Sequence, residues 1–198
     1  ELQSIRKDDY EYLWQGDPEY WGRRSPVLFP IVGSVWEKCF RVDGKVYEMG
    51  QHGFARDMDF ELVSCSETEV WYRLESTEKT LSAYPWPFVL EIGYRLEGNS
   101  VTVLWKVTNP GESEMYFQIG AHPAFNYPDY DPETPDRGVV EFYRNENLQR
   151  SGFKGKGCVD PEARFSMPVS EDGRVRLKRD TFDDIDTLMF EDNQVHRI

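Results

Sequence analysis

The stretch FVLEIGYRLEGNSVTVLWKVT, residues 88–108, contains two alternating runs separated by a short polar turn. Apolar side chains occupy every second position on one face of each run. They are Phe88, Leu90, Ile92, Tyr94 and Leu96 in the first run, and Val101, Val103, Trp105 and Val107 in the second. A period of two is the pattern of a β-strand with one buried face, and the Gly98-Asn99 pair favours a tight turn. Residues 88–108 are therefore predicted to form an antiparallel β-hairpin.

The same pattern recurs along the chain. Residues 40–49 alternate around Asp43-Gly44, which predicts a second hairpin. Further strands are predicted at residues 27–32, 60–65, 69–74, 115–119, 139–143, 174–177 and 187–191. Helical periodicity is weak, and residues 127–137 and 154–167 read as irregular segments. Many short strands predict an all-β, antiparallel sandwich or barrel.

The composition is that of a globular protein. The chain has 198 residues, 39% hydrophobic and 30% charged, which predicts one domain with a real core. Its net charge of −13 argues against binding to nucleic acid or to a membrane surface. No segment is apolar and long enough to span a membrane, and no signal peptide is visible. The three cysteines have no metal-ligand spacing, so a reducing, cytoplasmic location is expected.

Both ends of the chain suggest a longer domain. The first residue is not Met, and residues 1–5 and 194–198 alternate like the middle of a strand. We therefore expect the chain to be a partial version of a longer domain. His196 lies in the second of these runs and is expected to be structural or exposed.

Two histidines lie beside turn residues and aromatic side chains. His52 is found in QHGFARD, residues 51–57, and His122 in IGAHPAFNYP, residues 119–128. Because histidine titrates near neutral pH, either could exchange a proton with a substrate. In a chain with 15% aromatic residues, the pair indicates a pocket for a polar, ring-shaped substrate such as a sugar. The alternative is that each histidine is a structural hydrogen-bonding group at a strand end.

Five stretches, taken together and in order, resemble the aldose 1-epimerase (galactose mutarotase) family, and most closely its bacterial LacX-type branch. They are LWQGD at 13–17, RSPVLFPIVG at 24–33, QHGFARD at 51–57, GAHPAFNY at 120–127 and DTLMF at 186–190. The resemblance implies an antiparallel β-supersandwich, with residues 1–198 forming a single partial domain that lacks its first strand and its C-terminal strands. It also implies interconversion of the α and β anomers of a free hexose, such as galactose or glucose, with no metal and no cofactor. The sequence sets neither the sugar nor the oligomeric state.

The resemblance assigns roles to individual residues. His122 is similar to the histidine that protonates the sugar ring oxygen, and His52 to the histidine that hydrogen-bonds the sugar near that oxygen. Asp186 is similar to an aspartate that binds sugar hydroxyls, which suits a carboxylate because it accepts two hydrogen bonds. Asp183 and Asp184, in the same segment, are alternative candidates for this role.

The arginines have two interpretations. Arg56 either pairs with Asp57 or Asp59, or reaches into the pocket as a substrate-binding residue. In the second case it could hold the phosphate of a hexose 6-phosphate, because a guanidinium binds phosphate in a bidentate manner. The same two interpretations, a structural arginine or a phosphate-binding one, apply to Arg23 and Arg24. The candidate residues for stacking against a sugar ring are Trp14, Trp36, Trp86 and Phe125, with core packing as the alternative for each.

Two departures from the family pattern matter. Ser34 stands where family members commonly carry a sugar-contacting arginine. The general base of the family is a glutamate beyond the DTLMF stretch, and the chain ends at Ile198 before such a position; Glu191 does not match it. These departures keep open a non-catalytic sugar-binding or sensing protein on the same fold. The arginines keep open a hexose-6-phosphate 1-epimerase.

Overall fold

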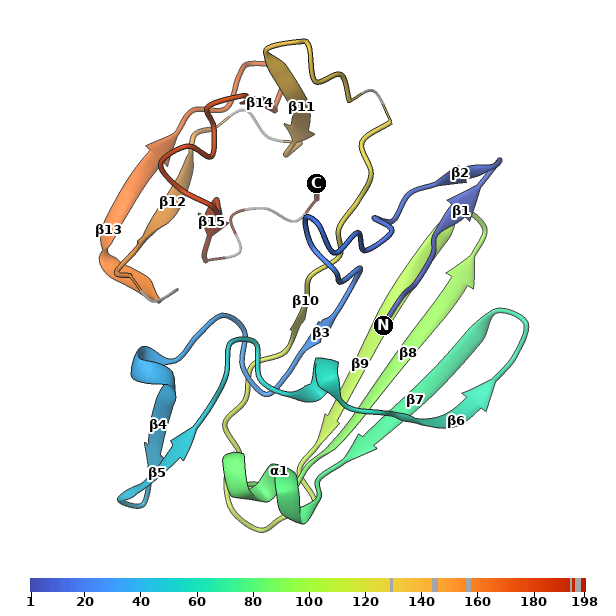
Figure 1. The fold of residues 1–198 in the computed structure, drawn as a ribbon, viewed down its shortest axis with the longest axis vertical. Helices are drawn as coiled ribbons and strands as arrows, with labels where there is room; N and C mark the ends of the chain where they lie inside the picture. The colour runs from blue at the N-terminus through green and yellow to red at the C-terminus, as the bar shows by residue number, and fades with distance from the viewer. Residues whose placement is uncertain (129, 144–145, 156–157, 193, 195–196) are drawn as a thin grey trace. The chain divides into compact units, whose positions relative to one another are not determined.

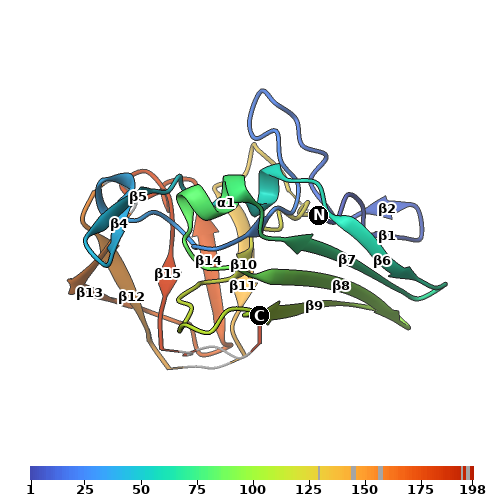
Figure 2. The ribbon, with the colours of Figure 1, turned by 90° about the horizontal axis from the view of Figure 1, so that it is seen from below.

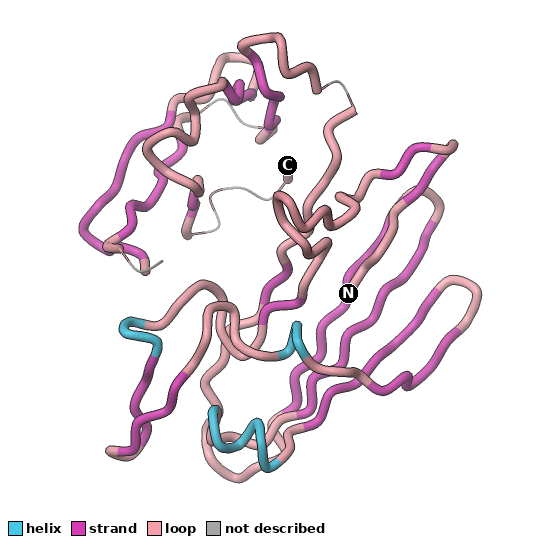
Figure 3. Tube along the Cα trace, in the orientation of Figure 1, coloured by secondary structure: helices cyan, strands magenta, loops and turns pink. Residues whose placement is uncertain are grey.

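The computed structural model describes residues 1–128, 130–143, 146–155, 158–192, 194 and 197–198. It divides into two compact units. The first contains Glu1–Gln3 and Gln15–Pro123, and the second contains Ser4–Trp14 and Ala124–Ile198. Strands and loops make up nearly all of the trace, as Figure 3 shows, and the strand pairs are antiparallel. The predicted all-β, antiparallel fold class is therefore confirmed.

A four-stranded sheet dominates the first unit (Figure 1). Its strands, in spatial order, are β6 (Glu61–Cys65), β7 (Glu69–Glu75), β8 (Val89–Glu97) and β9 (Ser100–Thr108). In the β8–β9 hairpin Glu97 pairs with Ser100, which leaves Gly98 and Asn99 as the turn. The hairpin predicted from residues 88–108 is confirmed.

Smaller elements complete this unit. They are β3 (Val27–Leu28), η1 (Trp36–Lys38), β4 (Cys39–Val42), β5 (Lys45–Glu48), η2 (Ala55–Asp57), α1 (Glu78–Ala83) and β10 (Gly120–Ala121). Strands β4 and β5 form the second predicted hairpin, and β3 pairs with β10. The short helix α1 begins at Thr77, whose side chain accepts a hydrogen bond from the Thr80 backbone N–H in a capping box.

The sheet has one apolar face and one charged face. On the apolar face Leu90 and Ile92 are almost fully buried, in the core of the unit. On the other face the Glu91 carboxylate pairs with Arg73 at 3.0 Å and with Lys106 at 2.6 Å. These residues sit opposite one another on the neighbouring strands β7, β8 and β9, which lie side by side in Figure 2. The alternation of the sequence thus decides which face meets the core.

Aromatic rings fill much of this core. Phe29 is completely buried, with its ring centroid 5.0 Å from that of Phe88 and 6.1 Å from that of Tyr84. Burial raises the pKa of the Tyr84 hydroxyl, which donates a hydrogen bond to the carbonyl oxygen of Tyr116. This packing holds Phe29 in place. Its backbone carbonyl accepts hydrogen bonds from the candidate site described below.

The second unit is built from short strands. They are β1 (Arg6–Lys7), β2 (Tyr10–Glu11), β11 (Asp136–Glu141), β12 (Leu148–Phe153), β13 (Val159–Met167), β14 (Arg174–Lys178) and β15 (Met189–Phe190). They form a three-stranded sheet in the order β13-β12-β15 and the pairs β11–β14 and β1–β2. In the part of this unit that the structure describes, the buried core cluster contains Phe142, Leu148, Met167, Val169 and Val175.

The prediction of an irregular segment at residues 154–167 is wrong, because β13 occupies most of it. Pro161 obscures this strand, since a proline in a strand interior normally argues against a sheet. The register explains how it fits. Ser151 pairs with Arg164 and the next residue, Gly152, pairs with Asp160, so residues 161–163 bulge out of the ladder. A bulge needs no ladder hydrogen bond from the proline nitrogen.

Other predicted strands are shorter than expected or absent. Residues 27–32 contribute only β3, because Pro30 has no N–H to continue a ladder. Residues 115–119 form no strand; the Gln118 backbone N–H bonds the carbonyl of Pro30, and its side chain accepts from the Val32 N–H. Residues 1–5 also form no strand. Strand β11 begins earlier than the predicted 139–143, and β15 is shorter than 187–191. His196 lies outside the described residues.

Candidate functional site

His122 is placed by the pairing of β3 with β10. Gly120 pairs with Leu28 and Ala121 with Val27, and the ladder continues with a 3.0 Å hydrogen bond from the His122 N–H to the Pro26 carbonyl. His122 therefore stands at the end of β10, where its side chain is exposed. Because the strands are antiparallel, the chain just before Pro26 lies beside it.

His52 lies in a tight corner built on Phe29. His52 and Gly53 have φ values of 64° and 69°, in the left-handed region. The N–H groups of Phe54 and Ala55 then both donate to the Phe29 carbonyl, at 3.0 and 3.1 Å. A Cβ atom on Gly53 would lie 2.2 Å from that carbonyl oxygen, so only glycine fits there without moving the backbone.

Two hydrogen bonds tie His52 to Gly33. The His52 N–H donates to the Gly33 carbonyl at 2.8 Å, and the Gly33 N–H donates to His52 Nδ1 at 3.0 Å. Because Nδ1 accepts, the proton of the neutral ring is on Nε2. Burial lowers the pKa of His52, and the positive charges of Arg56 and His122 lower it further. At neutral pH His52 is thus an uncharged ring that offers an Nε2–H donor.

The rings of His52, His122 and Trp21 lie close together. The ring centroids of His52 and His122 are 6.0 Å apart, at 76° to each other. The Trp21 ring lies 5.0 Å from that of His122, tilted by 43°. Sequence reasoning missed Trp21, although an aromatic side chain in a loop rich in Pro and Gly is the available signal.

The four candidates named for stacking differ in their environments. Trp86 is a core residue, 9% exposed, with its ring centroid 5.0 Å from that of Tyr84. Trp36 is 51% exposed in η1. Trp14 and Phe125 belong to the second unit, where Phe125 is exposed.

Arg56 agrees in part with the first interpretation, in which it pairs with a neighbouring aspartate. Its Nη2 donates to the Gln51 carbonyl at 2.9 Å, and its Nε lies 3.7 Å from the Asp57 carboxylate. The same side chain also lines a cavity of about 270 Å³ that has Tyr72 and Tyr94 in its wall. Arg56 is therefore close enough to influence His52 electrostatically while its guanidinium faces other partners.

The other two arginines are also engaged. Arg23 Nη2 pairs with the Asp57 carboxylate at 2.7 Å, and Arg24 Nη1 donates to the Gln3 carbonyl at 2.7 Å. Both guanidinium groups therefore have partners within the first unit. Ser34 follows Gly33 and is partly buried.

Asp186 belongs to the second unit and is exposed just before β15, as are Asp183 and Asp184. Its role beside the histidines stays a prediction.

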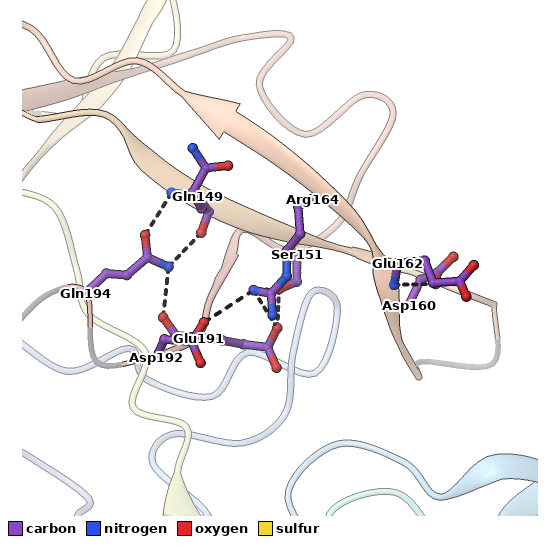
Figure 4. Close-up of polar contacts among 8 residues, drawn as sticks. All are labelled: Gln149, Ser151, Asp160, Glu162, Arg164, Glu191, Asp192 and Gln194. Carbon is purple, nitrogen blue, oxygen red and sulfur yellow. Dashed lines mark hydrogen bonds and ion pairs between the residues drawn. The ribbon is translucent and has the colours of Figure 1, made fainter.

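Glu191 has a structural explanation. Its carboxylate accepts a hydrogen bond from the buried Ser151 hydroxyl and pairs with Arg164 at 3.0 Å. Arg164 also donates to Ser151 at 3.1 Å, so the three side chains link β12, β13 and the end of β15 (Figure 4). Gln194 extends this network by bonding the backbone of Gln149 on β12.

Two further observations concern only the described part of the chain. It contains no group of three or more His, Cys, Asp or Glu side chains placed to hold a metal ion. None of its helices has both the length and the apolar character needed to cross a membrane.

Comparison with known proteins places this arrangement in a family. Residues 1–152 match the family model described as aldose 1-epimerase. The chain is 36% identical over 173 residues to the chromosomal protein LacX of Lactococcus lactis subsp. lactis, covering 83% of this chain and 58% of LacX. The chain thus spans less than two thirds of the length of the curated relatives that it matches.

Two solved structures share the fold. One is a galactose mutarotase related enzyme from Lactobacillus acidophilus, with a TM-score of 0.85 and 34% identity over 93% of this chain and 61% of that one. The other is a galactose mutarotase-like protein from Lactobacillus casei, with a TM-score of 0.80 and 32% identity, covering 93% of this chain and 64% of that one. The chain belongs to the aldose 1-epimerase family, in the branch that contains the LacX proteins.

Proposed function

We propose that this chain carries the acid and the sugar-binding histidine of an aldose 1-epimerase that interconverts the α and β anomers of a free hexose. The observation that carries the proposal is the histidine pair. Burial and nearby positive charges keep one ring neutral and the Gly33 N–H fixes its tautomer, while the other ring is exposed, with its centroid 6.0 Å away. A pair of like groups in unlike environments can divide the tasks of hydrogen bonding and proton transfer.

In the proposed reaction His122, as an imidazolium, gives its proton to the ring oxygen of the sugar. The bond between C1 and the ring oxygen breaks, a base takes the proton of the C1 hydroxyl, and C1 becomes an aldehyde carbon. Rotation about the C1–C2 bond and the reverse steps close the ring on the other face. Proton transfer of this kind needs no net oxidation or reduction.

His52 has a different role in the proposal. Its Nε2–H donates a hydrogen bond to the sugar beside the ring oxygen, and Asp186 accepts hydrogen bonds from sugar hydroxyls. The resemblance to the family implies that the base is a glutamate, and the proposal assigns this role to no residue of the chain.

The hexose 6-phosphate alternative has less support. A phosphate site needs guanidinium groups aimed at the ligand, whereas Arg23, Arg24 and Arg56 each bond a carboxylate or a backbone carbonyl. The proposed role of Arg56 is to contact substrate hydroxyls with its remaining N–H groups, while its charge adds to the effect of burial in keeping His52 neutral.

The test is magnetisation-exchange NMR on the anomers of galactose and glucose in the presence of this 198-residue chain. Faster anomer exchange, reduced about a hundredfold or more in His122→Ala, the usual effect of removing a general acid, would support the proposal and show that a base also lies within these residues. Asp186→Ala should weaken sugar binding, and Asp184→Ala is its matched control.

Two other outcomes would point away from an epimerase. Sugar binding without faster exchange would mean that the pocket is present and the base is missing from these residues. If that binding also survives His122→Ala, it would favour the non-catalytic sugar-binding protein. If the chain showed no binding and no faster exchange with any common hexose or pentose, the proposal would be overturned.

A further inference from the structure

We propose that Trp21 is the aromatic platform of the sugar site, on which one C–H face of an aldohexopyranose rests while His122 reaches the ring oxygen. This inference rests on the proposed function and adds to it the shape of the ligand: a closed six-membered ring with an apolar face.

The position of Trp21 follows from the strand pairing. Because β3 and β10 are antiparallel and their ladder extends to Pro26 and His122, the segment before Pro26 passes beside the His122 side chain. The two rings lie 5.0 Å apart between centroids and are tilted by 43° rather than stacked. Trp21 is only partly buried, and its neighbour His122 is exposed.

Several contacts hold the loop that carries Trp21. The Trp21 N–H donates to the Asp17 carbonyl at 2.8 Å, and the Asp17 carboxylate accepts from the Glu19 N–H at 2.9 Å. After Trp21, the pair of Arg23 with Asp57 ties the loop to η2, which directly follows the His52 corner. The loop that carries the ring is therefore held before a ligand arrives, which lowers the entropy cost of binding.

The chemistry of a pyranose matches this surface. Its C–H bonds point out of the two ring faces and carry partial positive charge, whereas the face of an indole is electron-rich. Most of its hydroxyls point outward from the ring edge, where His52 and His122 can hydrogen-bond them. A linear polyol has comparable hydroxyls without the ring face, so it distinguishes stacking from hydrogen bonding.

A structural role for Trp21 is the competing explanation: the indole would pack against His122 only to orient it. Such a role predicts a change in the proton-transfer step with unchanged sugar affinity. The platform predicts a loss of affinity, and a direct response of the indole to the sugar.

The experiment is an NMR titration of the chain labelled with ¹⁵N-tryptophan, using galactose as ligand and galactitol as control. The Trp21 indole signal is assigned by its absence in Trp21→Phe. We expect this signal to shift with galactose and not with galactitol. Trp21→Ala should raise the galactose Kd about tenfold, while Trp21→Phe, which keeps a ring, should raise it about threefold or less. Tyr20→Ala, in the same loop at a side chain that is 75% exposed, should leave the Kd unchanged.

The outcomes separate this inference from the function on which it rests. If galactose shifts the His122 imidazole signals but not the Trp21 indole, and Trp21→Phe and Trp21→Ala bind as tightly as the unchanged chain, the platform is refuted and the sugar site stands. If galactose shifts neither ring, both proposals fail.

Discussion

Two glycine turns of the first unit use positive φ values in opposite ways. Gly98, in the β8–β9 hairpin, has φ 58° and no atom within 4 Å of where its Cβ would be. Gly53, in the His52 corner, has φ 69° and would place a Cβ 2.2 Å from the Phe29 carbonyl oxygen. The first turn is a local solution that joins two adjacent strands. The second depends on a buried backbone group from a different part of the chain.

The contrast explains where the candidate chemistry lies. The hairpin presents a regular surface whose polar groups pair with each other, as Glu91 does with Arg73 and Lys106. The corner forces His52 into a left-handed conformation and fixes its ring through Gly33. Backbone held in sparsely populated conformations clusters at functional sites, because only a well-packed surrounding can maintain it.

The largest expected effect is that of Gly53→Ala, compared with Gly98→Ala. Both substitutions place a side chain at positive φ, which costs about 1 kcal/mol. Only Gly53→Ala adds a clash with a backbone oxygen, so its total loss should be about 4 kcal/mol. Urea unfolding of both variants measures the difference. Equal losses would mean that the corner can open freely and that Phe29 does not hold it.

The next effect separates the two ends of the hairpin. Leu90 is completely buried and Leu96, on the same face of β8, is 52% exposed. Leu90→Ala should cost about 3 kcal/mol through the cavity it leaves, and Leu96→Ala less than about 1 kcal/mol. The same unfolding measurement applies. A large loss for Leu96→Ala would show that the tip of the hairpin is covered in solution by a partner surface.

The regular half of this comparison could be predicted from sequence. Alternation and turn residues are local signals, so the β8–β9 and β4–β5 hairpins were found with nearly their observed bounds. Strand β13 was missed because a bulge around Pro161 hides it, and a bulge is set by the partner strand β12. Strands β3 and β10, two residues each, are too short to show alternation.

The same physics limits prediction of the site. His52 and His122 were found through their motifs, and the structure brings their rings together. Trp21 reaches His122 only because two very short strands pair, and Gly33 reaches His52 only because the corner folds back. No pattern within either segment encodes such contacts, since each depends on a distant backbone group.

A smaller effect tests the link between the corner and Gly33. In His52→Asn the amide oxygen lies near the position of Nδ1, and asparagine tolerates positive φ. It should keep the Gly33 bond and the stability but weaken galactose binding about tenfold, because the Nε2–H donor is gone. In His52→Gln the amide reaches the position of Nε2 but leaves the Gly33 N–H without its acceptor, so stability should fall by about 1 kcal/mol. Urea unfolding measures the stability of both variants, and the galactose titration measures their binding. If His52→Gln were the more stable of the two, Nδ1 would not be the acceptor.

The smallest effect is the pH dependence of stability. The pKa of His52 in the folded protein lies below its ordinary value of 6.5, mainly through burial and then through the charges of Arg56 and His122. Between the two pKa values the unfolded chain binds more protons at this site than the folded one, so stability falls as the pH drops through 6.5. His52→Asn removes this contribution and should lose less stability than the unchanged chain between pH 7.5 and 5.5. Urea unfolding at both pH values measures it. Identical losses of stability in both proteins would mean that the His52 ring is not held neutral. The division of tasks between the two histidines would then need another basis than the Gly33 contact.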